Sequence, residues 1–200
     1  MNTLHRPALP SVSEPVAVDM ECHPATPCAA RFSVQTRFTP QRSASGWMLQ
    51  MVYEVTGDVQ RLRLPQLAES GPADGLWAHT CFEAFFSEPG SSAYRECNFS
   101  PSTRWAHYRF TAERLRDGGA PNLAAPVISA PYVTSDRLVL TASMAAAPLP
   151  QESSALICAP TAVLELTDGS LSYWAVQHPT TKPDFHTRVG WSVPLRWAIL

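Results

Sequence analysis

The sequence has little charge, little glycine and no long apolar run. Charged residues make up 16% of its 200 positions and 45% are hydrophobic, whereas charged residues are about 25% of typical soluble domains. Disorder driven by excess charge is therefore excluded. A membrane-spanning helix is excluded as well, because no segment has the apolar length that one needs. A chain of this size can bury a full core without a metal or a disulfide.

An excess of charge of one sign is also missing. The 15 basic and 17 acidic residues nearly cancel and form no block, so we expect neither a nucleic acid nor a membrane as partner. Residues 1–15 contain three prolines and no apolar stretch like that of a secretory signal. We expect a flexible extension over residues 1–15, a single domain over 16–200 and a cytoplasmic location.

Motifs for catalysis and cofactor binding are absent too. None of the nine glycines belongs to a GxGxxG pattern, and no serine stands in a GxSxG elbow. The odd number of cysteines and the lack of a CxxC pair favour free, buried thiols over a zinc site or a disulfide framework. The sequence therefore predicts a protein that is not an enzyme and that needs no cofactor.

What the sequence does contain is alternation of apolar and polar residues. The even positions of 31–38 and the odd positions of 47–55 are almost all apolar. A period of two places every second side chain on one face, so both segments are predicted to be half-buried strands. Further short runs follow the same pattern at 59–64, 79–86, 94–99, 105–110, 127–134, 137–143, 156–166 and 171–176.

About ten strands with regular turns and no alternation with helices predict an all-β fold of two packed antiparallel sheets, a β-sandwich. The strongest hairpin signal is Asp168 followed by Gly169, between the last two runs. The single helix-like stretch is 111–116, which has room for one or two turns.

A glutamate interrupts the apolar run at 81–86. Glu83 shares a strand face with Cys81 and Phe85, which predicts a buried carboxyl group. Burying an ionised carboxylate without a partner is costly, so Glu83 should meet an arginine, a histidine, a ligand hydroxyl or a cation. The next two strands would form a hairpin beside this one and bring Arg104 within reach.

Trp77 precedes the Glu83 strand and follows a loop at 69–75, a place where an indole can stand at the mouth of a cleft. Flat aromatic faces stack on sugar rings, while carboxylates and arginines bind sugar hydroxyls. Trp77, Glu83 and Arg104 together therefore suit a carbohydrate, although each tryptophan by itself is more often part of a core.

Metal ligands are a separate possibility near the C-terminal end. His178, Asp184 and His186 follow the last predicted strand, and imidazole and carboxylate suit zinc or iron. His79 is a further candidate. Loop histidines that bond to the backbone are commoner, so the metal site is an alternative and not the first choice.

Three segments in order resemble the DOMON-like domain family, which is related to the family 9 carbohydrate-binding modules: LWAHTCFEAFF at 76–86, YRECNFSPSTRWAHYRF at 94–110 and LSYWAVQHPTTKPDFH at 171–186. The resemblance extends over about residues 16–195 and implies a jelly-roll-like β-sandwich. The wider superfamily binds sugars in some members and haem in others, and some relatives hold calcium in a sandwich loop.

The resemblance also implies roles for particular residues. In the sugar-binding members, a tryptophan, a glutamate six residues later and an arginine after the next strand contribute to the site. Trp77, Glu83 and Arg104 match that pattern. A second tryptophan usually completes a stacking sandwich, and Trp174 and Trp191 are both candidates for it.

Three hypotheses follow. The first is a non-catalytic module that binds a saccharide or similar polyol through Trp77, Glu83, Asn98, Arg104 and Trp174. The second is a metal or haem site that uses His178, Asp184 and His186. The third is a structural or partner-binding domain without a small ligand, in which Glu83 and Arg104 form a buried ion pair. The sequence does not determine the oligomeric state.

Overall fold

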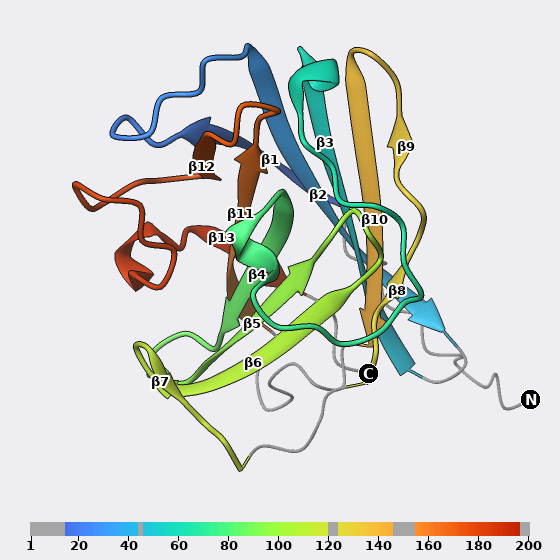
Figure 1. The fold of residues 1–200 in the computed structure, drawn as a ribbon. Coiled ribbons are helices and arrows are strands. Elements are labelled where there is room, and N and C mark those ends of the chain that lie inside the picture. Colours follow the sequence, from blue (N-terminus) through green and yellow to red (C-terminus); the bar gives the residue numbers. More distant parts are fainter. Residues whose placement is uncertain (1–14, 44–45, 120–123, 146–154, 197–200) are drawn as a thin grey trace, which may run out of the picture.

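The computed structural model describes residues 15–43, 46–119, 124–145 and 155–196, which fold into two packed antiparallel sheets (Figure 1). The predicted all-β sandwich is confirmed. The predicted N-terminal extension lies, apart from Pro15, outside the described residues. Within those ranges, no helix has the length and apolar character needed to cross a membrane.

The first sheet contains β1 (Val16–Cys22), β2 (Phe32–Ser43), β3 (Gly46–Gly57) and β10 (Arg137–Ala145), in this order. Two short strands, β8 (Val127–Ile128) and β9 (Tyr132–Val133), pair with the free side of β10. Pro131 separates these two strands, and its missing N–H explains why the predicted strand at 127–134 is interrupted.

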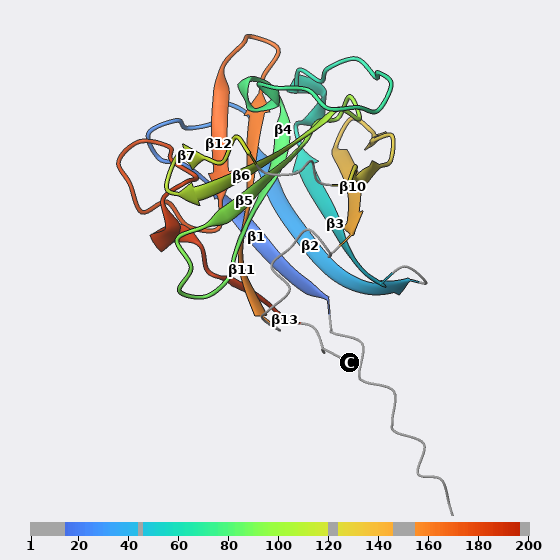
Figure 2. The same ribbon diagram turned by 90° about the horizontal axis from the view of Figure 1, so that it is seen from below.

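The second sheet has the order β7 (Leu115–Arg116), β6 (Trp105–Ala112), β5 (Tyr94–Phe99), β4 (Cys81–Ser87), β11 (Ala155–Glu165) and β12 (Leu171–Ala175). The last strand, β13 (Val193–Arg196), pairs with the beginning of β11. β1 belongs to both sheets, because residues 16–20 pair with β2 whereas Glu21 and Cys22 pair with β12. Figure 2 shows the two layers.

Alternation along the strands fills the space between the sheets, as the sequence predicts. In β3, the side chains of Leu49, Met51, Tyr53 and Val55 are at most 1% exposed, while Trp47 lies among residues whose side chains are not described. The Tyr53 ring stacks on Phe82 of the opposite sheet at a centroid distance of 4.9 Å. Burial of such apolar area is the main stabilising contribution, at about 25 cal/mol per Å².

Three sequence predictions of local structure are wrong or incomplete. Residues 59–64 form a 3-10 turn (η1, Val59–Arg61) and not a strand. The chain leaves β3 at Gly57, which has a φ of 118°. A Cβ atom at this position would lie 2.0 Å from the Arg31 carbonyl oxygen, so only glycine fits here. Residues 111–116 are not helical, because Arg114 at φ 57° reverses the chain from β6 into β7. β1 and β13 were not among the predicted strands.

The hairpin predicted at Asp168 and Gly169 is confirmed between β11 and β12. Gly169 has a φ of 85°, and its N–H donates to the Leu166 carbonyl oxygen at 2.9 Å. The Asp168 carboxylate accepts hydrogen bonds from the N–H and the hydroxyl of Ser170. A left-handed residue at the end of a tight turn is the position where glycine is favoured.

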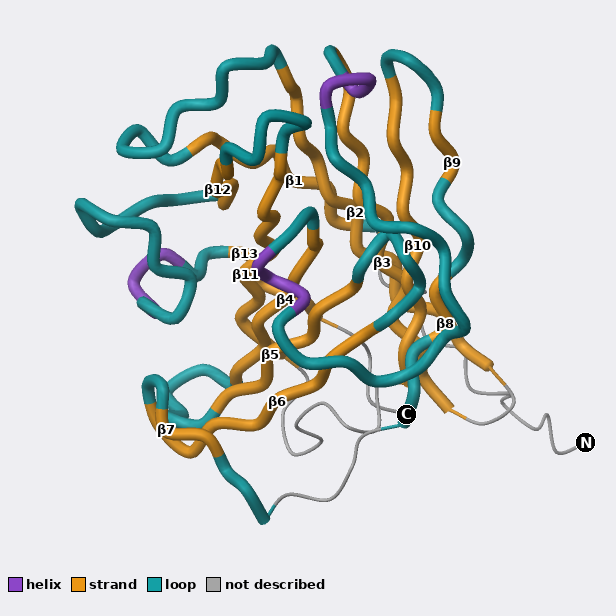
Figure 3. The backbone as a smooth tube through the Cα atoms, viewed as in Figure 1, coloured by secondary structure: helices purple, strands orange, loops and turns teal. Residues whose placement is uncertain are grey.

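The second sheet is covered on both of its faces. All seven residues of β4 are buried, and the outer face of the sheet carries a second apolar cluster that includes Phe85, Tyr94, Phe110 and Trp191. The turn η2 (Leu76–Ala78) lies in front of β4 on this side (Figure 3). The outer face of the second sheet is therefore the place where side chains of several strands and loops meet.

Candidate functional site

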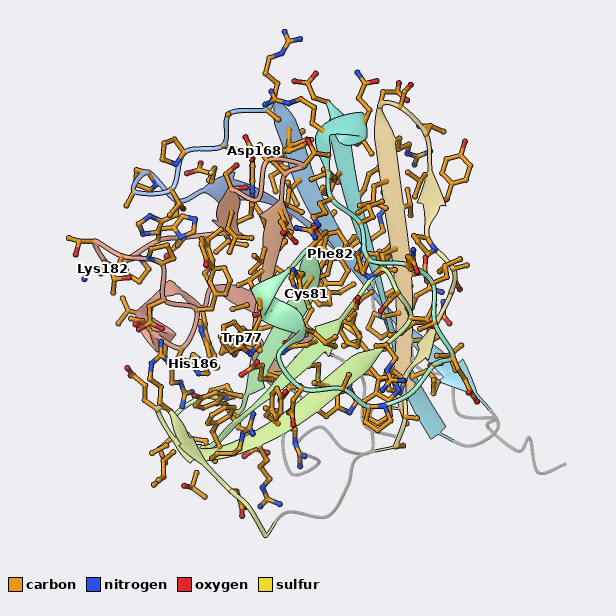
Figure 4. All side chains as sticks on the ribbon, in the orientation of Figure 1. Trp77, Cys81, Phe82, Asp168, Lys182 and His186 are labelled. Atoms are coloured by element: carbon orange, nitrogen blue, oxygen red, sulfur yellow. The ribbon has the colours of Figure 1, made fainter. Side chains whose placement is uncertain are left out.

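A pocket of about 400 Å³ opens on the outer face of the second sheet. Its floor consists of side chains from five neighbouring strands: Glu83, Phe85, Glu96, Tyr108, Phe110, Val163 and Tyr173. The rim consists of Trp77 in η2, Arg114 and Arg116 near β7, and residues 183–186. Figure 4 shows Trp77 and His186 close to each other on this side of β4.

Strand register brings the floor together. Glu83 lies opposite Asn98, and Phe85 lies opposite Glu96, which in turn lies opposite Tyr108. Residues with the same orientation on adjacent strands share a face, so Glu83 and Glu96 are diagonal neighbours on the outer side. Their carboxyl groups face the same pocket, although 13 positions, from 83 to 96, separate them in the sequence.

Glu83 is buried, as its place in the apolar run predicts, with 2% of its surface exposed. Its Oε2 accepts a hydrogen bond from the Thr161 hydroxyl at 3.3 Å, while its Oε1 has no hydrogen-bond partner among the described residues. Burial, and then the nearby Glu96 carboxyl, raise the pKa of Glu83 well above its ordinary value. The Glu83 carboxyl is therefore a buried polar group with a free acceptor in the pocket floor.

Glu96 is the second buried carboxyl, with 5% of its surface exposed. Its Oε1 accepts a hydrogen bond from Asn98 Nδ2 at 2.9 Å, and its Oε2 lies 3.7 Å from His186 Nε2. Burial is the main reason why its pKa is raised. Asn98 itself does not line the pocket; it lies in the sheet between the two glutamates and orients Glu96.

His186 is neutral in this arrangement. The Tyr94 hydroxyl oxygen accepts a hydrogen bond from the main-chain N–H of Arg114 at 3.0 Å and shares a second hydrogen bond with His186 Nδ1 at 2.6 Å. Burial, and next the charge of Arg114, lower the pKa of His186 to about 4. His186 therefore brings no positive charge to the pocket at neutral pH.

Trp77 stands at the rim with 54% of its surface exposed, on a loop that is tied to the start of β6. The Ala73 N–H donates to the Trp105 carbonyl oxygen at 2.8 Å, and the Tyr108 hydroxyl donates to the Asp74 carboxylate at 2.6 Å. The Arg104 guanidinium donates to the Pro72 carbonyl oxygen of the same loop at 2.7 Å.

Arg104 is therefore placed differently from the sequence expectation. It does not line the pocket, and among the described residues Glu83 forms no ion pair. The buried Glu83–Arg104 pair of the structural hypothesis is wrong. The guanidinium reaches the Trp77 loop instead, because the turn between β5 and β6 directs it away from the outer face of β4.

The two candidate tryptophans for a second stacking surface also lie elsewhere. Trp174 is buried between the sheets, where its Nε1 donates to the Ser172 hydroxyl at 2.9 Å, so the structure does not bring it to the pocket. Trp191 packs in the outer cluster next to Phe85, with 5.5 Å between the two ring centroids. Alternation explains the first case: Tyr173 points outward and lines the pocket, so its neighbour Trp174 points inward.

The predicted metal ligands are not brought together. His178 Nε2 bonds to the Glu21 carbonyl oxygen, and Asp184 is bound by the Arg114 guanidinium. His79 bonds to Glu165, and only Asp184 and His186 of the predicted set line the pocket. Within the part of the chain that the structure describes, no group of three or more histidine, cysteine, aspartate or glutamate side chains is placed to hold a metal ion. The metal hypothesis built on these residues is therefore not supported by their placement.

Sequence reasoning missed Glu96, Tyr108, Tyr173 and Phe185, which all line the pocket. A signal for Glu96 was present, because it alternates with Tyr94 and Asn98 in a strand that pairs with the Glu83 strand. The aromatic residues carried no comparable signal, since an aromatic residue in a strand is equally compatible with a core.

The chain is a β-sandwich with a pocket on the outer face of one sheet. No family model and no curated protein matches the chain. Solved structures of similar fold include a proposed carbohydrate-binding protein from Bacteroides uniformis ATCC 8492, with a TM-score of 0.60 and 14% sequence identity over 92% of this chain and 86% of that one. This likeness shows a shared sandwich fold.

Weaker similarities are to family 9 carbohydrate-binding modules from Caldicellulosiruptor kristjanssonii. The structure with glucose gives a TM-score of 0.47 at 10% identity over 90% of this chain and 83% of the other. The structure with cellotriose gives 0.45 at 11% identity over 79% and 71%. Membership of the DOMON-like family stays a prediction from the sequence.

Proposed function

We propose that this chain is a non-catalytic binding module whose outer-face pocket holds a saccharide or a similar polyol. The observation that carries the proposal is the Glu83 carboxyl, which is buried in the pocket floor with its Oε1 unpartnered among the described residues. A buried acceptor without a partner is costly, and a ligand hydroxyl in the pocket would satisfy it.

The rest of the pocket suits a sugar ring. Trp77 offers a largely exposed indole at the rim, and Tyr173 and Phe185 offer two further rings whose centroids lie 6.0 Å apart. Aromatic faces accept the apolar C–H face of a sugar, while a few placed polar groups fix its orientation. The volume of about 400 Å³ lies in the range of ordinary small-ligand pockets.

Binding without catalysis is proposed because the sequence carries no catalytic motif and because the neighbour from Bacteroides uniformis is described as a proposed carbohydrate-binding protein. That description makes saccharides the first ligands to test. The proposal itself depends on the pocket, since a fold can serve many functions.

The test is a thermal-shift screen of the protein against hexoses, disaccharides and cell-wall oligosaccharides. A ligand present at a hundred times its dissociation constant stabilises the folded state by about 2.7 kcal/mol. We expect a rise in Tm with at least one sugar class, and we expect Trp77→Ala to weaken that ligand at least tenfold, or about 1.4 kcal/mol.

Tyr132→Ala is the matched control, because Tyr132 is a similarly exposed aromatic residue (58%) on β9 that does not line the pocket. This variant should keep the sugar response. A flat response to every sugar, or equal affinity in Trp77→Ala and in the parent protein, would contradict the proposal.

A further inference from the structure

Two buried carboxyl groups share the pocket, and among the described residues neither forms an ion pair with an arginine or a lysine. Glu83 forms no ion pair among the described residues, and the group within ion-pair distance of Glu96 is His186, at 3.7 Å. That imidazole is neutral at pH 7, because burial lowers the pKa of His186 to about 4. A buried carboxyl group either keeps its proton or is paired with a cation, so an ionised Glu83 would need a positive charge from a ligand.

The arginines at the rim act on Glu96. The positive charges of Arg116 and Arg114 partly offset the effect of burial on its pKa. Arg114 also donates to the Asp184 carboxylate at 2.7 Å, and the Arg116 guanidinium lies 3.7 Å from the centroid of the Tyr108 ring. The pKa of Glu83, by contrast, reflects its burial, the Glu96 carboxyl and the Thr161 hydroxyl, so Glu83 is the carboxyl without a cationic partner among the described residues.

The remaining walls favour a cation as well. Phe85, Phe110 and Tyr173 contribute aromatic rings to the floor beside the two glutamates, while Arg116 lies over the Tyr108 ring. The face of an aromatic ring attracts a positive charge, and more strongly where water is excluded. Carboxylates surrounded by aromatic rings form a site for an organic ammonium group, which needs both countercharge and contact with its C–H groups.

We propose that the ligand group held between Glu83 and Glu96 is a protonated amine and, on the saccharide function proposed above, that the pocket takes amino sugars with a free amine. The ammonium group donates to the unpartnered Glu83 Oε1 and supplies a positive charge beside the ionised Glu83 carboxylate. The sugar ring stacks toward Trp77. An N-acetylated sugar has no such charge and binds more weakly.

Proton release accompanies this binding. Burial raises the pKa of Glu83 well above its ordinary value, which favours the protonated carboxyl in the empty pocket. An ammonium beside it favours the ionised form, and the displaced proton passes to the buffer. The other titratable or charged groups of the pocket are Glu96, Tyr108, Tyr173, the Arg114–Asp184 pair, Arg116 and His186. His186 does not take the proton, since its pKa is about 4.

The experiment is isothermal titration calorimetry with matched ligands: glucosamine, galactosamine and mannosamine, each with its parent hexose and its N-acetyl derivative, and tetramethylammonium as a cation without a sugar. We expect at least one amino sugar to bind tenfold or more tightly than both of its neutral counterparts. Titration at pH 7 in two buffers of different ionisation enthalpy should show a net release of protons on binding.

Glu83→Gln should remove the preference for the amine and the proton release together. Glu21→Gln is the matched control, because Glu21 is exposed on β1 and does not line the pocket; it should leave both unchanged. The stability of each variant, followed by its Tm, separates lost binding from lost folding.

The outcomes distinguish this inference from the function on which it rests. Hexoses that bind as tightly as their amino derivatives would overturn the inference and support saccharide binding. Tetramethylammonium binding without any sugar binding would overturn the saccharide function and support a cation site. A protein that binds none of these ligands would overturn both.

Discussion

Glu83 shows how a single residue can link stability to function. Its carboxyl lies in the floor of the pocket, with the Thr161 hydroxyl as its one hydrogen-bond donor among the described residues. An isolated chain would leave this group in water. Burying the Glu83 carboxyl therefore makes folding less favourable, and such a cost is typical of residues that are retained for binding.

The pH dependence of stability reports this burial. Because the pKa of Glu83 is raised in the folded protein, the folded state keeps the Glu83 proton to a higher pH than the unfolded state does. The stabilisation that the bound Glu83 proton gives to the folded state is therefore lost as the pH rises above the unfolded pKa of about 4.3. Each tenfold difference in proton affinity between the two states corresponds to about 1.4 kcal/mol.

We predict that Glu83→Gln raises the free energy of unfolding at pH 7 by more than about 1 kcal/mol and that the gain becomes small near pH 4. Urea unfolding of both proteins across this pH range is the measurement. Glu21→Gln, at an exposed position on β1, should change stability little at any pH. A Glu83→Gln variant that is less stable at pH 7 would show that the carboxylate is ionised and well paired.

At the scale of the element, loops and strand ends position the rim of the pocket. The Trp77 loop runs along the start of β6 and is held by main-chain bonds of Trp105, by the Thr103 hydroxyl on the Ala68 carbonyl oxygen and by the Arg104 guanidinium. Thr103 adopts a φ of 73°, which is unusual for a β-branched residue. The turn between β5 and β6 thus fixes the loop.

We predict that Arg104→Ala weakens the ligand several-fold by loosening this loop and lowers stability by about 0.5–1.5 kcal/mol. Hydrogen exchange distinguishes this role from direct ligand contact. In the variant without ligand, the Ala73 amide, which bonds to the Trp105 carbonyl oxygen, should exchange faster. Unchanged exchange together with a loss of affinity would show that Arg104 touches the ligand.

The two sheets cooperate at the scale of the whole molecule. Tyr53 of β3 crosses the core, and its hydroxyl donates to the main-chain oxygen of Glu83 at 2.8 Å. The first sheet, which contributes no residue to the pocket lining, therefore holds the strand that carries the central carboxyl. The stacking of Tyr53 on Phe82 acts at the same place.

Tyr53→Phe should lower the free energy of unfolding by about 1–2 kcal/mol, since it leaves a buried carbonyl oxygen with one donor fewer. Ligand affinity should fall at the same time, because β4 loses a fixed point. Urea unfolding followed by circular dichroism measures the first effect and calorimetry the second. Tyr132→Phe, at an exposed position on β9, serves as the control. Equal stability of Tyr53→Phe and the parent protein would contradict the assigned role.

The sequence by itself determined the class of fold and the burial of Glu83. Both follow from a period of two, which a strand imposes on its own residues without reference to any other part of the chain. The residues 49–55 and the hairpin at Gly169 show this directly. Where a special backbone angle or a proline decided the outcome, as at Gly57, Arg114 and Pro131, the pattern alone predicted too much regular structure.

Only the tertiary structure decided which side chains share the pocket. Glu96 meets Glu83 through the pairing of β4 with β5, and Tyr173 takes the outward position that excludes Trp174. The spacing along the chain predicted that Arg104 lies near the Glu83 carboxyl, but after the turn between β5 and β6 its guanidinium bonds to the Trp77 loop. Spacing along a chain gives the face on which a residue lies, whereas register and loop path give its neighbours, and these depend on contacts between distant segments.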